Sequence, residues 1–90
     1  MIIHIGDNIS LLEKDILLIL DKKSIELSKI NSSFINNLID NDMLVNNIDS
    51  DTKSYIIVQE KDKCKLYVSN ISSISLLNRH RDIDRRDINE

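Results

Sequence analysis

Hydrophobic residues open the chain in two short runs. Residues 1–5 are apolar apart from His4, and they stop at Gly6, Asp7 and Asn8. Glycine tolerates a positive φ, and Asp and Asn side chains form local turns. Residues 9–12 resume the apolar pattern. These positions predict two strands joined by a turn.

A continuous aliphatic run follows at residues 16–20, after the polar interruption Glu13-Lys14-Asp15. Five residues are few for a helix, and such a run is typical of a strand buried on both faces. The interruption predicts a bend or bulge that projects Lys14 outward. A single helix over residues 10–20 is the alternative, because Leu12, Ile16, Ile19 and Leu20 also fit helical spacing.

A helical stripe begins after Ser28, a plausible N-cap. Its apolar members recur at intervals of four and five residues: Ile30, Phe34, Ile35, Leu38 and Ile39. The opposite side carries Asn and Ser residues that suit a solvated face. We expect this helix to end near Asn41 in a left-handed cap, and a polar, acidic loop to occupy residues 46–51.

The stretch 53–79 predicts a hairpin and a short helix. Residues 55–59 and 64–69 alternate as strands, with a four-residue loop at 60–63 built around a type I turn. Ser72 or Ser73 caps the last helix, from which Leu76 and Leu77 pack back. The whole pattern predicts a small β-rich α+β domain of four to five strands, with one central helix and a short C-terminal helix.

Ninety residues form one domain, which we place at 1–80, followed by a charged tail at 81–90. All four arginines lie in the last twelve residues, where acidic residues cancel them, so a solvated or frayed end is expected. The net charge of −3 provides no general positive field for nucleic acid.

The single cysteine, Cys64, excludes an intramolecular disulfide and fits a reducing compartment. No apolar run approaches 18 residues, and no charged start precedes a cleavable apolar segment. We therefore expect a cytoplasmic protein with no membrane segment.

Catalytic and metal sites require clustered His, Cys or carboxylate groups. His4, Cys64 and His80 are far apart, and one glycine cannot build a phosphate-binding loop. His4 fits a packed or edge histidine, and Cys64 a small buried hydrophobe. We expect no enzymatic activity, no cofactor, no metal and no small-molecule ligand.

Nucleic-acid binding requires cations directed at phosphates. Lys61, Lys63 and Lys65 alternate, which favours a solvated hairpin end over a contact surface. The other candidates are Lys14, Lys53 and Arg79, each beside a predicted bend or element end. They form an interface only if the fold places them on a common face.

Four segments together resemble the extracellular matrix regulators of the RemA/RemB family, closest to the RemB branch. They are Ile3-His4-Ile5-Gly6-Asp7, then Lys14 to Asp21, Lys53 to Val58, and Tyr67 to Arg79 with its Ser-x-x-Leu-x-x-Arg ending. The resemblance covers about residues 1–80. It implies a bacterial cytosolic domain with a LytTR-like β-rich core.

RemA members assemble into rings and bind DNA as activators of biofilm matrix genes, so the resemblance implies a homo-oligomer with DNA as its partner. Lys14 matches the family's arginine at the bend. An arginine pair before the hairpin is replaced here by Ser50 and Asp51, followed by Thr52 and Lys53. The first hypothesis is a DNA-binding regulator that holds phosphates with Lys14, Lys53 and Arg79. The alternative is a structural or adaptor paralogue that oligomerises and binds protein without DNA affinity.

Overall fold

The first two apolar runs form an antiparallel hairpin, as predicted. In the computed structural model, which describes residues 1–79, strand β1 (Ile2–Gly6) pairs with β2 (Ile9–Leu12). The connecting residues Gly6, Asp7 and Asn8 all have positive φ, between 54° and 94°. The φ of 94° at Gly6 is strained for any residue with a Cβ, and a Cβ there would also displace the Asn70 side-chain oxygen, 2.6 Å away, so glycine is favoured in this turn.

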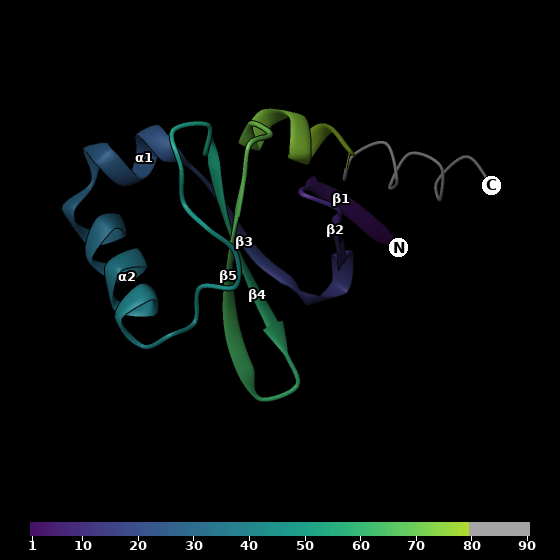
Figure 1. Cartoon of the computed structure of the whole chain (residues 1–90), viewed down its shortest axis with the longest axis horizontal. Coiled ribbons are helices and arrows are strands. Elements are labelled where there is room, and N and C mark those ends of the chain that lie inside the picture. Colours follow the sequence, from purple (N-terminus) through teal and green to yellow (C-terminus); the bar gives the residue numbers. More distant parts are fainter. Residues whose placement is uncertain (80–90) are drawn as a thin grey trace.

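The remaining strands form a second, antiparallel sheet in the order β3-β4-β5 (Figure 1). They are β3 (Ile16–Asp21), β4 (Ser54–Glu60) and β5 (Lys63–Ser69). A short 3-10 turn, η1 (Glu13–Asp15), makes the predicted bend, and the pairing of β3 with β4 is irregular at Leu17. The alternative helix over residues 10–20 is therefore wrong.

Strand β3 is not buried on both faces, contrary to the sequence-based prediction. Leu17 is 58% exposed and Leu18 is 43% exposed. The physical reason is that β3 lies at the edge of its sheet, whereas the central strand β4 is buried from Ser54 to Val58. A continuous aliphatic run does not distinguish an edge strand from a central one.

The hairpin between β4 and β5 is tighter than predicted. Glu60 pairs with Lys63, so the loop contains two residues, Lys61 and Asp62, instead of four. Lys61 adopts a φ of 55°. Two-residue hairpin loops require positive φ because their twist must match that of the strands, and here lysine supplies it without an Asn-Gly pair.

Two helices follow β3. The sequence interpretation missed α1 (Lys22–Leu27), whose N-cap is the side chain of Asp21, accepting from Lys23 N. Helix α2 (Lys29–Asp40) begins at Ser28, as predicted, since the Ser28 hydroxyl accepts from Asn31 N. Asn41 is its C-cap, as predicted, but with a φ of −97° it is not in the left-handed region. The residue with a left-handed backbone is the next one, Asp42.

Only part of the predicted stripe on α2 reaches the core. Ile35 is buried and Leu38 and Ile39 are partly buried, whereas Ile30 is 82% exposed and Phe34 is 44% exposed. The helix touches the sheet chiefly through β5, so the side of the stripe that carries Ile30 and Phe34 has no sheet beneath it.

The last helix in the described part of the chain covers residues 73–79. Ser72 is its N-cap, accepting from Ser75 N. Leu76 is fully buried, but Leu77 remains 43% exposed, so only one of the two predicted leucines packs back completely. The tail predicted at 81–90 lies outside the described residues. Within residues 1–79, no helix is long and apolar enough to cross a membrane.

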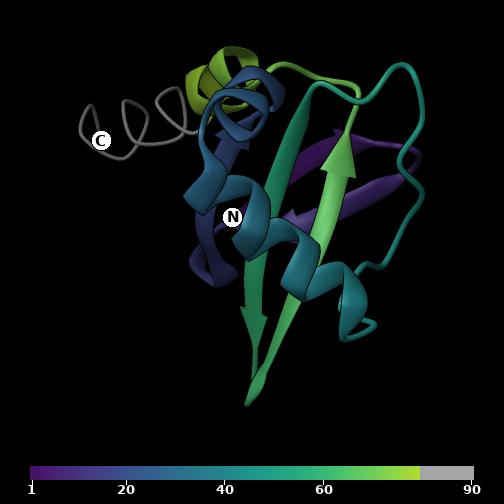
Figure 2. The same cartoon turned by 90° about the vertical axis from the view of Figure 1, so that its left-hand side faces the viewer.

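The central sheet carries a hydrophobic core on each face (Figures 1 and 2). On one face, the β1–β2 hairpin and the last helix pack on the sheet through residues that include Ile3, Ile5, Leu11, Ile56, Val58, Tyr67 and Leu76. On the other face, α1 and α2 pack on it through residues that include Ile25, Ile35, Tyr55, Ile57, Leu66 and Val68. The molecule is therefore an α+β domain in which a three-stranded sheet forms the middle layer.

Candidate nucleic-acid interface

Lys14 lies on η1, at the end of the central sheet where the β4–β5 hairpin turns. It is exposed, as predicted, and lines a shallow depression with Asp15, Glu60 and Lys61. Glu60 also binds Lys65, at 2.9 Å between carboxylate oxygen and Nζ. Two carboxylates thus accompany the two lysines around this depression, so its local charge is close to neutral.

Lys53 lies at the opposite end of the sheet. Its carbonyl accepts from Lys22 N at 2.9 Å, and its N–H donates to Ser69 O at 2.8 Å. These bonds place the start of β4 beside the start of α1. Lys22, Lys23 and Lys53 line one open depression there, which we call the basic corner.

The basic corner contains more positive than negative charge. Its other lining residues are Asp21, Ser50, Thr52 and Ser72. Asp21 is the one carboxylate among them, and it already accepts from Lys23 N and from the Ser73 hydroxyl. In the described part of the chain, none of the three lysines takes part in an ion pair.

The sequence-predicted cations do not share one face of the monomer. Lys14 and Lys53 lie at opposite ends of β3, and six residues of extended strand separate those ends by about 20 Å. Arg79 is exposed and donates from its guanidinium to the carbonyl of His4 on β1. The structure therefore groups Lys53 with Lys22 and Lys23, and places Lys14 and Arg79 elsewhere.

The two residues that replace the family's arginine pair are separated from each other. Ser50 lines the basic corner. Asp51 lines a different, polar depression with Asp7 and Asp49, and its N–H donates to the Asp49 carboxylate at 2.8 Å. The acidic replacement is thus turned away from the basic corner, and neither residue lies at the Lys14 end of the sheet.

The hairpin lysines Lys61, Lys63 and Lys65 line a common depression with Glu60 and Asp62. The hydrogen bond from Lys65 to Glu60 raises the pKa of that lysine, and the nearby carboxylate charge acts in the same direction. Here too carboxylates accompany the cations.

The remaining polar candidates are held in local contacts. The Nδ1 of His4 lies 2.6 Å from the Ser10 hydroxyl on the neighbouring strand, as expected for an edge histidine. Cys64 is partly buried against the core beneath the helices. Among residues 1–79, no group of His, Cys, Asp and Glu side chains is arranged to hold a metal ion.

Sequence reasoning missed Lys22 and Lys23, although they follow the aliphatic run directly. A missed signal was Asp21, a good N-cap residue in front of two lysines, which indicates a helix start.

Comparison with family models, with curated proteins and with solved structures finds no match for this chain.

Proposed function

We propose that the protein is an oligomeric DNA-binding transcriptional regulator of the RemA/RemB type, acting in the cytoplasm on extracellular matrix genes and not as an enzyme. The observation that supports this proposal is the basic corner, where Lys22, Lys23 and Lys53 gather around one open depression. The proposal also includes the membership of residues 1–80 in the RemB branch and a LytTR-like core, both of which follow from the resemblance described above.

The chemistry of the basic corner suits phosphate contacts. A lysine ammonium is a compact point charge that binds phosphate oxygens without fixed geometry. Such contacts position a protein on DNA and carry no sequence information. The hydroxyl of Ser50 adds a neutral donor at the edge of the same depression. We therefore assign backbone contacts to this corner.

One corner per chain gives weak binding, because the whole chain carries a net charge of −3. Three neutralised phosphates contribute a slope of about −2.7 to the dependence of log affinity on log salt. Assembly multiplies this term, which is why the proposal includes an oligomer. Lys14 and Arg79 are part of the interface only if a second copy brings them beside a basic corner.

The test is a titration of duplex DNA at low salt, with protein up to the order of tens of micromolar, where non-specific binding is measurable. We expect retention that falls steeply as salt is added. The variant Lys23→Ala/Lys53→Ala should lose most of this retention. Lys61→Ala/Lys63→Ala removes the same charge from the hairpin and should change it little. Equal losses in both variants, or no retention by the unmodified protein, would refute the proposal.

An assembling adaptor without DNA affinity is the second candidate. It is favoured by the neutral environment of Lys14 and by the large exposed side chains of Leu17, Leu27 and Ile30, between 58% and 88% exposed. Absence of DNA retention by a protein that still forms oligomers would support this candidate over the first.

A further inference from the structure

The outer edge of β3 is open, whereas the other edges nearby are occupied. On β5, Leu66 N donates to Met43 O and Leu66 O accepts from Val45 N. On β1, the carbonyls of His4 and Ile5 accept from Arg79 and from Ser69. Within residues 1–79, the backbone of residues 17–20 makes no hydrogen bond apart from the pairing with β4.

The open edge is also apolar. It reads Ile-Leu-Leu-Ile-Leu, without a proline or a charge before Asp21. Soluble proteins normally protect such an edge with charged residues, proline or a covering segment, because its unpaired N–H and C=O groups are a template for another strand. The irregular pairing at Leu17 leaves the regular part of the edge at residues 18–21.

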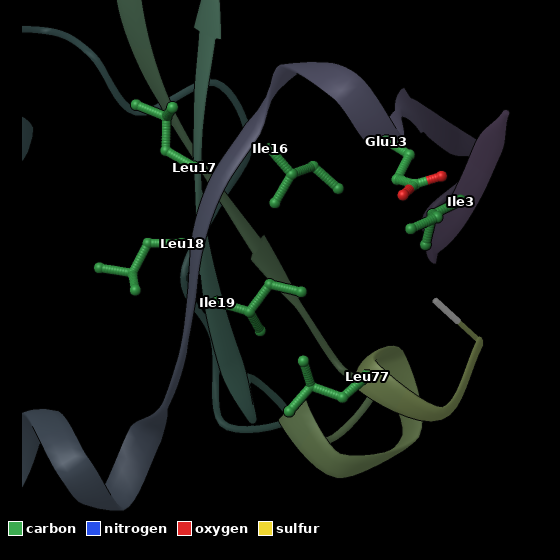
Figure 3. A pocket seen from close by; sticks show the side chains of 7 residues that line it. All are labelled: Ile3, Glu13, Ile16, Leu17, Leu18, Ile19 and Leu77. Carbon is green, nitrogen blue, oxygen red and sulfur yellow. The ribbon is translucent and has the colours of Figure 1, made fainter. Parts of the chain in front are cut away.

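Apolar side chains project from both faces of this edge, and those of Leu17 and Leu18 are exposed. Leu17 and Leu18 project from one side of β3, and Ile16 and Ile19 project from the other, towards Leu77 (Figure 3). The groove that these residues line with Ile3 and Glu13 has a volume of about 270 Å³. Within residues 1–79, the outward backbone groups of this edge and the side chains of Leu17 and Leu18 therefore lack a covering segment, whereas Ile16 and Ile19 pack in part against the core.

The hydrogen bonding of β3 limits how a second strand can pair with it. Leu66 directs its N–H and C=O groups away from β4, to Met43 O and Val45 N, so its partner Ile57 directs its own groups towards Leu18 on β3. Bonded and non-bonded positions alternate in an antiparallel ladder. Leu20 and Leu18 therefore bond to β4, and Ile19 and Asp21 direct their N–H and C=O groups outward. In a pair of β3 strands, outward-facing residues of one copy must face outward-facing residues of the other, and these are every second residue. The two-fold axis must therefore pass through one residue and not between two.

The charges at the two ends of β3 favour antiparallel pairing of two copies. The η1 end carries Glu13, Lys14 and Asp15, a net charge of −1, and the other end carries Asp21, Lys22 and Lys23, a net charge of +1. In a two-fold antiparallel pair, each η1 end lies beside the Lys22–Lys23 end of the partner strand. Opposite charges facing each other across strands stabilise the pair, whereas like charges destabilise it.

We propose that a second copy of this chain adds its β3 strand, antiparallel, to the outer edge of β3, with the two-fold axis near the middle of the strand. The two central sheets then become one six-stranded sheet, and the η1 end of each strand lies beside the Lys22–Lys23 end of the partner strand. The interface is isologous, so it closes after two copies and leaves no edge for fibre growth.

This pairing brings together the lysines that the monomer separates. The two-fold axis places the basic corner of each chain at the η1 end of the other, so Lys14 lies beside the partner's Lys23. The inference rests on the proposed function only in requiring an oligomer, and its support is the edge of β3 itself. DNA retention and assembly are therefore tested separately.

The first experiment measures self-association by sedimentation velocity over a range of concentrations, without DNA. We expect a monomer–dimer equilibrium. The variant Leu18→Lys should weaken it roughly 100-fold, because a charge would be buried in an apolar interface. Leu27→Lys makes the same change at an exposed leucine on α1 and should leave the dimer intact. A monomer at all concentrations, or a dimer disrupted by Leu27→Lys and not by Leu18→Lys, would overturn the proposal.

The second experiment tests the antiparallel orientation. Asp15→Lys and Lys23→Asp should each weaken the dimer several-fold, since each gives the two adjoining strand ends the same sign of charge. The double variant Asp15→Lys/Lys23→Asp should restore most of the loss. A double variant no tighter than either single variant would exclude the antiparallel pairing of the two β3 strands.

The two proposals fail in different ways. If Leu18→Lys dissociates the dimer and the unmodified dimer shows no DNA retention, the interface stands and the regulator proposal fails. If DNA is retained by a protein that Leu18→Lys does not dissociate, the regulator proposal stands and the β3 interface is wrong.

Discussion

The two edges of the three-stranded sheet differ in how their hydrogen-bonding groups are satisfied. The β5 edge is closed by the chain's own segment at residues 43–46, through two backbone bonds at Leu66 and through the Asn46 side chain, which bonds both N and O of Val68 at 2.8 Å. The β3 edge has no such segment in the described part of the chain. Within residues 1–79, one edge of the sheet is thus covered by another segment of the chain and the other edge is not.

The contrast indicates which edge serves stability and which serves association. Buried leucines such as Leu66 hold the closed edge in the core beneath α2, whereas the open edge displays leucines to solvent. An apolar strand edge that contributes little to the fold of its own chain costs solubility unless another strand covers it. This difference can be measured by making the same substitution at both edges.

The largest expected effect is on the closed edge. Leu66→Ala should lower the free energy of unfolding by about 2–5 kcal/mol, because Leu66 is fully buried. Leu17→Ala removes the same atoms from a side chain that is 58% exposed and should change it by less than about 0.5 kcal/mol. Denaturant unfolding at a concentration where the protein is monomeric checks both values. Equal losses would show that the β3 edge is also part of the monomer's core.

A smaller effect is expected from Asn46→Ala. The substitution leaves N and O of Val68 without their partner, which should cost about 1–3 kcal/mol in the free energy of unfolding. Asn47→Ala is the matched control, since Asn47 is exposed. If both variants unfold at the same denaturant concentration, the closing segment does not contribute to the stability of β5.

Local patterns predicted most of the elements, because their signals lie within a few residues. The turn at Gly6, the N-cap at Ser28 and the hairpin strands follow from turn residues and alternation. Strand order was not predictable in the same way. The five aliphatic residues of β3 fit a central strand as well as an edge strand, and only the path of the whole chain decides which strand lies outside.

The candidate site shows the same limit. Lys53 was singled out correctly as a residue at an element end, but its neighbours Lys22 and Lys23 come from a part of the chain about thirty positions away in sequence. Their proximity depends on the β3–β4 pairing, which brings Lys22 N to Lys53 O. Lys14 is exposed, as predicted. Its carboxylate neighbour Glu60, however, is brought near it by the same long-range pairing of β3 with β4, which the sequence did not predict.

Hydrogen exchange separates the two edges directly. In the monomeric variant Leu18→Lys, the Ile19 N–H has no acceptor among residues 1–79, so it should exchange nearly as fast as an unstructured amide, while Leu66 N–H stays protected. In the unmodified dimer the Ile19 amide should become protected through the bond to the second copy. Amide exchange measured by NMR for both proteins checks this. A protected Ile19 amide in the monomeric variant would contradict the assignment of an open edge.

Alkaline titration gives the smallest effect and tests whether β3 stays paired with β4 in the monomer. Burial raises the pKa of Tyr55 on β4, and the charge of Glu26 adds to the rise. Burial likewise raises the pKa of Tyr67 on β5, with Glu60 adding to it. Because both folded-state pKa values lie above the unfolded value near 10, this contribution to stability is complete below about pH 10. It is lost as pH rises through the folded-state values.

The two tyrosines report on different strands. Tyr55 is the cross-strand neighbour of Leu20 on the open edge, whereas Tyr67 belongs to the strand whose far edge is closed. Phenolate absorbance of the single variants Tyr67→Phe and Tyr55→Phe isolates each titration. We expect both to lie above the ordinary tyrosine value in the dimer and in the Leu18→Lys monomer. An ordinary value for Tyr55 in the monomer alone would mean that β3 detaches from β4 when its partner is absent, so that the second copy is needed to complete the fold as well as the sheet.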